Sequence, residues 1–123
     1  FGTRIAVSEN TRMEAEKHRP GRFVFRRLAQ VQLKGRSKPL EVYELAGLRE
    51  DIDEDISGMI EMFEKGLGLF MDSKFAEAKA IFLAILEKRP NDGPSKTYIS
   101  LCEFYEKNPP ENSWRGIYVQ ESK

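Results

Sequence analysis

The chain has 123 residues, of which 40% are hydrophobic and 33% are charged. This length and composition indicate a folded globular protein of one compact domain or two small units, and they exclude the disordered and fibrous classes. No stretch approaches the roughly 18 consecutive apolar residues of a membrane span, and the first residues lack the pattern of a secretory signal, so we expect a cytoplasmic protein without membrane contact.

The formal net charge is zero, but the two halves of the chain differ in sign. Residues 1–46 contain ten Lys/Arg and five Asp/Glu, a balance of +5, and the remaining residues contain ten and fifteen, a balance of −5. The sign changes within the acidic run REDIDEDISG. A reversal of this kind predicts two structural units with a junction between them. The predicted segments are 1–46, an acidic junction at 47–58, a helical unit at 59–109 and a docking tail at 110–123.

The first half predicts strands around one short helix. TRIAVS at 3–8 is typical of a strand, and Ser8 is a suitable N-cap for a helix that ends before RPGR. FVFRRLAQVQL at 23–33 alternates with a phase change near Arg27, which predicts a bulged strand. KPLEVYEL at 38–45 supplies the return strand and is apolar on both faces. Because so short a piece rarely buries a sufficient core, we expect it to be the edge of a larger sheet.

The second half predicts three helices, so the fold class is α+β. A first helical stripe runs from Ile52 to Phe70, and a second contains Phe75, Ala78, Phe82 and Ile85. We expect Gly66 to let these two helices approach closely, with Ala78 facing it. A third helix has Asp92 or Gly93 as its cap and ends before two prolines. The apolar residues of the tail, Trp114, Ile117, Tyr118 and Val119, predict that it docks onto the helices.

The helical half resembles a tetratricopeptide repeat, with the third helix as its cap. The resemblance depends on the spacing of Phe63, Gly66, Phe75, Ala78, Phe82 and Pro90, whereas Met62, Lys65 and Leu69 depart from the consensus. It implies binding of a peptide, a protein partner or a second copy of the chain. The predicted interaction surface is Ile60, Met62, Leu69 and Phe70. The alternative is that the hairpin or the tail packs on this face.

The first half resembles the end of the catalytic domain of bacterial class III adenylate/guanylate cyclases. The resemblance is carried by FGTRIAVSENTR followed by RFVFRRLAQVQLKGRSKPLEVYEL, and the stretch RPNDGPSKTYISLCEFYEKNPPENSWRGIYV resembles the segment that closes many of these enzymes. It implies that the strand–helix–hairpin part is a remnant of a cyclase catalytic domain. The intact enzyme would make cyclic AMP or GMP from ATP or GTP, with two Mg or Mn ions, at a site formed between two cyclase domains of a homodimer.

The resemblance also implies a phosphate-binding position. In this family a lysine from the loop of the last hairpin reaches the triphosphate, and the matching positions here are Lys34 and Arg36, either of which could be the contact. The alternative is that Lys34, Arg36 and Lys38 form a solvated turn that keeps an edge hairpin from aggregating. The metal-binding aspartates of the family lie upstream, and residues 1–46 contain no Asp. We therefore expect this segment alone to be catalytically inactive and to hold no metal.

Two other readings belong to different functional classes. One is a stand-alone tetratricopeptide-type scaffold, and the other is a nucleic-acid-binding unit built on the interleaved cations and aromatics of RPGRFVFRRLAQ. The modest +5 and the adjoining −5 disfavour nucleic acid. We expect Cys102 to be a buried structural thiol, because no cation cluster adjoins it, and His18 to serve at the surface of a helix end.

Overall fold

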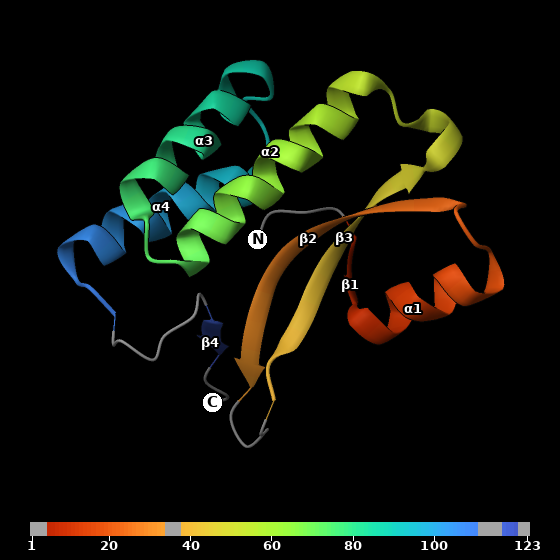
Figure 1. The fold of residues 1–123 in the computed structure, drawn as a ribbon, viewed down its shortest axis with the longest axis horizontal. Coiled ribbons are helices and arrows are strands. Elements are labelled where there is room, and N and C mark those ends of the chain that lie inside the picture. The colour runs from red at the N-terminus through yellow and green to blue at the C-terminus, as the bar shows by residue number, and fades with distance from the viewer. Residues whose placement is uncertain (1–4, 34–37, 111–116, 121–123) are drawn as a thin grey trace. The chain divides into compact units, whose positions relative to one another are not determined.

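The computed structural model describes residues 5–33, 38–110 and 117–120, and its architecture is α+β, as predicted. The described residues form two compact units. Residues 5–57 and 117–120 form the sheet unit, and residues 58–110 form the helical unit. Figure 1 shows the elements of both.

The sheet has the strand order β1-β3-β2-β4. β1 (Ala6–Ser8), β2 (Phe23–Leu33) and β3 (Leu40–Leu48) are antiparallel neighbours, and β4 (Ile117–Gln120) adds to β2 in parallel. The predicted front strand and hairpin are therefore confirmed.

β2 carries the irregularity that its sequence predicts. Its register against β3 shifts between Val24 and Phe25 and again between Arg27 and Ala29. The second shift leaves Leu28 as an extra residue beside the β3 pair Tyr43 and Val42. An extra residue of this kind bends a strand and increases its twist, which explains the change of alternation phase near Arg27.

The helix between β1 and β2 begins and ends where the sequence predicts. α1 spans Glu9–His18, and the hydroxyl oxygen of its N-cap Ser8 accepts the backbone N–H of Thr11 at 3.1 Å. The turn into β2 contains Gly21 at φ +70°, a left-handed conformation that glycine adopts without strain.

The helical unit is built around interlocked aromatic rings. α2 (Glu54–Met71) begins in the sheet unit and continues into the helical unit, where α3 (Phe75–Lys88) and α4 (Gly93–Lys107) follow. Their rings meet in edge-to-face and stacked pairs with centroids 4.9 to 6.0 Å apart. The rings are those of Phe63, Phe70, Phe75, Phe82, Tyr98 and Tyr105. The predicted helical stripes and the Asp92 cap are confirmed.

Gly66 lies at the close approach of α2 and α3. A Cβ added there would meet the Phe82 ring at 2.9 Å and Ile81 Cγ2 at 3.2 Å. The Phe82 ring therefore fills the space that the missing side chain leaves. That Ala78 also faces Gly66 stays a prediction.

The acidic run and the tail are both structured where they are described. β3 extends to Leu48, a 3-10 turn follows at Arg49–Asp51, and the Asp53 carboxylate accepts the N–H of Ile56 at 2.8 Å near the start of α2. The described part of the tail is β4, a strand that pairs with β2 in the sheet unit, which the sequence analysis does not predict. Docking of the tail onto the helices stays a prediction. None of the described helices combines the length and apolar character needed to cross a bilayer.

Candidate functional site

The predicted phosphate-binding residues belong to the stretch of sequence that joins β2 to β3. Lys34 and Arg36 fall between the end of β2 at Leu33 and the start of β3 at Leu40, and both lie outside the described residues. Their contact with phosphate therefore stays a prediction. The structure does describe the two arms that carry them, which pair as far as Val31 and Leu40.

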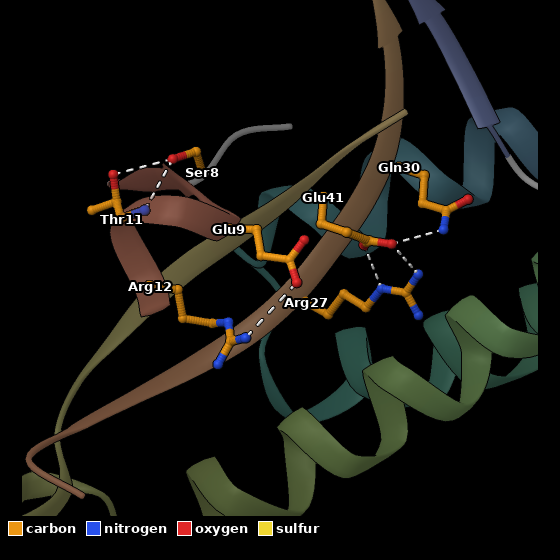
Figure 2. A network of polar contacts seen from close by, with 7 residues as sticks. All are labelled: Ser8, Glu9, Thr11, Arg12, Arg27, Gln30 and Glu41. Carbon is orange, nitrogen blue, oxygen red and sulfur yellow. Dashed lines mark hydrogen bonds and ion pairs between the residues drawn. The ribbon is translucent and has the colours of Figure 1, made fainter. Parts of the chain in front are cut away.

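A three-residue polar cluster joins these arms. Arg27 donates from Nε to Oε2 of Glu41 and from Nη2 to Oε1, both at 2.8 Å, and Gln30 Nε2 donates to the same Oε1 at 2.7 Å. Figure 2 shows the three side chains turned toward one another across the hairpin. Because a bidentate guanidinium–carboxylate pair has a fixed geometry, this cluster fixes the register of the arms beyond the bulge.

A second ion pair crosses the same two strands. Arg26 and Glu44 are register partners, and Arg26 Nε and Nη2 donate to Oε1 of Glu44 at 3.0 and 2.8 Å. Arg26 is only 1% exposed. A charge buried to this degree needs its partner, so the pair makes any other pairing of β2 with β3 costly.

α1 contributes a further cation to the sheet unit. The Arg12 guanidinium lies 4.8 Å from the centre of the Tyr43 ring on β3. It also lies 4.0 Å from the Glu9 carboxylate, a contact that Figure 2 shows. Its Nε is buried and has no hydrogen-bond partner within the described part of the chain. The cation–π contact, which favours a poorly hydrated cation, joins this side chain to the sheet.

These contacts give the hairpin a structural rather than a reactive character. Arg26, Arg27 and Arg12 each have a carboxylate nearby, so the described arms carry little excess charge. No nucleophile or acid–base pair is formed among them. Sequence reasoning missed both cross-strand ion pairs. Their signal was the opposite charges at Arg26/Arg27 and Glu41/Glu44, which are paired only once the bulge sets the register.

The predicted interaction surface on α2 is only partly accessible. Ile60 is 8% exposed and Phe70 is 2% exposed. Phe70 contacts the rings of Phe75, Tyr98 and Tyr105 in the aromatic core. Assigning these two residues to a surface is therefore wrong, because the helical unit uses them for its own packing. Met62 and Leu69 are half-buried and stay candidates.

The titratable candidates take the places that the sequence predicts. Cys102 is fully buried, and burial raises the pKa of its thiol to about 12, with a further contribution from Glu106. A thiol of this pKa is protonated at neutral pH and is a poor nucleophile. His18 is exposed at the end of α1, with Nε2 3.1 Å from Glu14. Across residues 5–33, 38–110 and 117–120, no three His, Cys, Asp or Glu side chains gather as metal ligands.

Comparison with known proteins gives one informative similarity. No protein-family model matches the chain, and no solved structure matches it. Among curated proteins, the chain is similar to an adenylate cyclase of Dictyostelium discoideum described as terminal-differentiation specific, with 31% identity over 103 residues. The match covers 83% of this chain and 5% of that protein, so the chain spans about one-twentieth of the relative's length.

Proposed function

We propose that this chain is the C-terminal part of a class III nucleotide cyclase, an enzyme that makes cyclic AMP or GMP from ATP or GTP. The observation that carries the proposal is the similarity to an adenylate cyclase. The match covers 103 of the 123 residues, so only 20 are left unmatched. Each of the two units is longer than 20 residues, and the match therefore includes residues of both the sheet unit and the helical unit. The sequence patterns of residues 1–46 and 89–119 support the same family independently.

In this proposal the hairpin supplies a cation to the substrate phosphates. In cyclisation the ribose 3′-hydroxyl loses its proton and its oxygen bonds to the α-phosphorus. The bond from that phosphorus to the oxygen bridging to the β-phosphate breaks, so negative charge grows on the departing pyrophosphate. Lys34 or Arg36 would stabilise that charge. The Arg27–Glu41–Gln30 cluster supports the role by fixing the register of the two strands, β2 and β3, that this stretch of sequence joins.

The metal ions implied for such an enzyme do not fit the residues of this chain that are described. Residues 1–46 contain no aspartate, and no group of three potential ligands gathers within the described ranges. Two-ion chemistry would therefore depend on carboxylates in another part of the enzyme, and this chain alone should be inactive. We assign it phosphate positioning and no metal-dependent step.

The helical unit would act as a dimerisation, protein-interaction or regulatory module. We assign its aromatic core to packing and give it no catalytic role. The half-buried Met62 and Leu69 are the residues that we expect to contact a second cyclase chain or a protein partner. A cyclase site formed between two domains depends on their relative placement, so a module that holds two chains together would raise activity.

The test is cyclase activity of the full-length protein with Lys34→Ala and Arg36→Ala introduced separately. One of the two should lower kcat by about tenfold or more, the effect of losing a charge-assisted contact of about 1.5–3 kcal/mol. Lys38→Ala is the matched control, since Lys38 is an exposed cation of the same turn and should leave kcat unchanged. Equal, small effects of all three changes would favour the solvated turn.

A second candidate, a tetratricopeptide-type scaffold, is favoured by the tight α2–α3 contact at Gly66. It predicts that the chain binds a peptide or protein partner without any nucleotide cyclase activity in the full-length protein. Cyclase activity that depends on Lys34 or Arg36 would exclude the scaffold as the main function.

A further inference from the structure

Two stripes of side chains meet where α2 approaches α3 within the helical unit (Figure 1). Gly66 lies at the meeting point, because a Cβ built on it would be 3.2 Å from Cγ2 of Ile81. Met62 and Leu69 lie four residues before and three residues after Gly66, so the three residues share one side of α2. Met62 and Leu69 are half-buried, which leaves this side of α2 partly open to solvent.

The stripe on α3 has apolar residues in its middle and a charge at each end. Its members are Glu77, Ile81, Ala84 and Lys88, which are spaced four, three and four positions apart as on a single face of a helix. The middle residues Ile81 and Ala84 are half-buried, and the end residues Glu77 and Lys88 are exposed. We call these four residues the α3 stripe.

The two end charges of the α3 stripe are not used inside the described part of the chain. Neither Glu77 nor Lys88 forms an ion pair or a side-chain hydrogen bond with another described residue. Glu77 lies in the first turn of α3 and Lys88 in the last turn, where each favours the helix macrodipole. Both charges therefore stay open to a molecule that packs on the stripe.

The α3 stripe is complementary to itself. If two copies of α3 pack antiparallel about a two-fold axis midway between Ile81 and Ala84, the larger Ile81 of each copy faces the small Ala84 of the other. Glu77 and Lys88 lie four positions outside these residues, so the same axis places each Glu77 opposite Lys88 of the other copy. A parallel arrangement would instead bring like charges together, which disfavours it.

We propose that the α3 stripe, with Met62 and Leu69 at its margin, binds a second copy of this chain in an antiparallel two-fold arrangement. Charge complementarity selects this occupant, since the end charges of one stripe match those of another. A contact made by one helix face is small, so we expect a dissociation constant of about 10 μM to 1 mM. The pairing is a property of the chain itself, whereas its role in an enzyme rests on the proposed function.

The pairing is tested by sedimentation equilibrium of the whole chain. The parent chain should dimerise, and more weakly as salt is raised, because exposed ion pairs are screened. Glu77→Lys and Lys88→Glu should each raise the dissociation constant by about tenfold or more, since either change replaces two attractive pairs with two repulsive pairs. Glu87→Lys is the matched control, an exposed carboxylate of the same helix outside the stripe, and it should stay within about threefold of the parent.

A mixture of the two variants separates pairing from helix stability. Glu77→Lys has a cation at both ends of the stripe and Lys88→Glu has a carboxylate at both ends, so only the mixed pair has two attractive contacts. An equimolar mixture should therefore associate within about threefold of the parent chain. Mixing changes the folding of neither chain, and near-ultraviolet circular dichroism checks that each variant keeps its packed rings.

The double variant, with Glu77→Lys and Lys88→Glu in one chain, tests the two-fold arrangement. Its stripe has the two charges exchanged, so it should dimerise with itself about as well as the parent does. It should not pair with the parent, because that pair would bring like charges together at both ends. Pairing with the parent as tight as with itself would overturn the antiparallel arrangement.

The role in an enzyme is tested in the full-length protein. At enzyme concentrations below the dissociation constant, each single variant should lower cyclase activity by about tenfold, and the equimolar mixture should recover it. If the chain pairs as proposed but the activity does not respond, the role of the pairing is overturned and the proposed function stands.

The remaining outcomes separate the two proposals. A parent chain that stays monomeric up to about 1 mM overturns the pairing and leaves the proposed function in place. Dimerisation that all the charge variants leave unchanged, or a mixture no tighter than its separate components, also overturns it. A full-length protein without cyclase activity overturns the proposed function, while charge-dependent dimerisation of the chain would still support the pairing.

Discussion

Single residues decide how closely the elements of this protein can pack, and Gly66 is the clearest case. A Cβ at this position would lie 2.9 Å from two atoms of the Phe82 ring. That ring is fully buried and packs against Phe63 and Tyr98, so it has no space into which to move. The closeness of α2 and α3 therefore depends on the missing side chain.

Gly66→Ala should destabilise the protein by about 1–3 kcal/mol, because overpacking outweighs the gain in helix propensity. Gly68→Ala is the matched control, since it lies on the same helix with nothing within 4 Å of its added Cβ, and it should stabilise by up to about 1 kcal/mol. Urea unfolding of both variants measures the difference. A stabilising Gly66→Ala would show that α2 and α3 are less closely packed than described.

Cys102 gives the chain a measurable pH response. Burial raises the pKa of this thiol from 9.0 to about 12, so between these values the folded chain keeps a proton that the unfolded chain has lost. Stability is thus fully present below pH 9.0 and is lost as pH rises toward 12. Relative to Cys102→Ala, the free energy of unfolding should fall by up to about 1.4 kcal/mol per pH unit above pH 9. Urea titrations from pH 8 to 10.5 measure it, and parallel curves would contradict a buried thiol.

At the scale of elements, the hairpin depends on charge pairs as much as on apolar contacts. Arg26 and Glu44 lie on facing strands, and Glu44→Leu would leave the nearly inaccessible guanidinium without this carboxylate. We expect a loss of about 3–5 kcal/mol, whereas Glu44→Leu combined with Arg26→Met should recover most of it, since a well-packed apolar pair replaces a buried ion pair at little cost. Chemical denaturation of both variants checks this. A double variant no better than the single one would show that the pair itself is required.

The elements also show what the sequence can and cannot predict. The bulge near Arg27, the Ser8 and Asp92 caps and the three helices follow from local patterns, and the structure has them where those patterns predict. β4 could not be predicted in this way, because four residues carry no clear period and their partner lies more than 80 positions away in the sequence. The buried state of Phe70 was missed for a related reason, since a helical stripe alone does not say how many neighbours will cover it.

The candidate site was predictable only as a position in the chain. Lys34 and Arg36 are assigned by their place in a family-like loop, and they lie outside the described residues. The cross-strand contacts between β2 and β3 depend on the register of the two strands. That register is set by an extra residue, Leu28, whose location the alternation indicates only approximately. The side-chain hydrogen bonds and ion pairs between β2 and β3 could therefore be identified only from the structure.

At the scale of the whole molecule, the two units differ in how completely they bury their own cores. In the helical unit, six aromatic rings contact one another, and the buried residues Phe63, Phe82 and Tyr98 come from three different helices. The sheet unit instead combines a narrow sheet with the polar helix α1, in which no residue is buried. Small units of the second kind rarely fold alone.

This contrast predicts that the helical part folds independently and the sheet part does not. A chain of residues 53–110, which keeps the Asp53 contact at the start of α2, should unfold cooperatively in urea and show near-ultraviolet circular dichroism from its packed rings. A chain of residues 1–57 should show neither, because it lacks both β4 and enough buried apolar surface. Gly66→Ala within the shorter helical chain should again cost about 1–3 kcal/mol, which ties its stability to the same contact. Cooperative unfolding of residues 1–57 alone would mean that these strands are a self-sufficient fold, and it would remove the argument that they belong to the edge of a larger catalytic sheet.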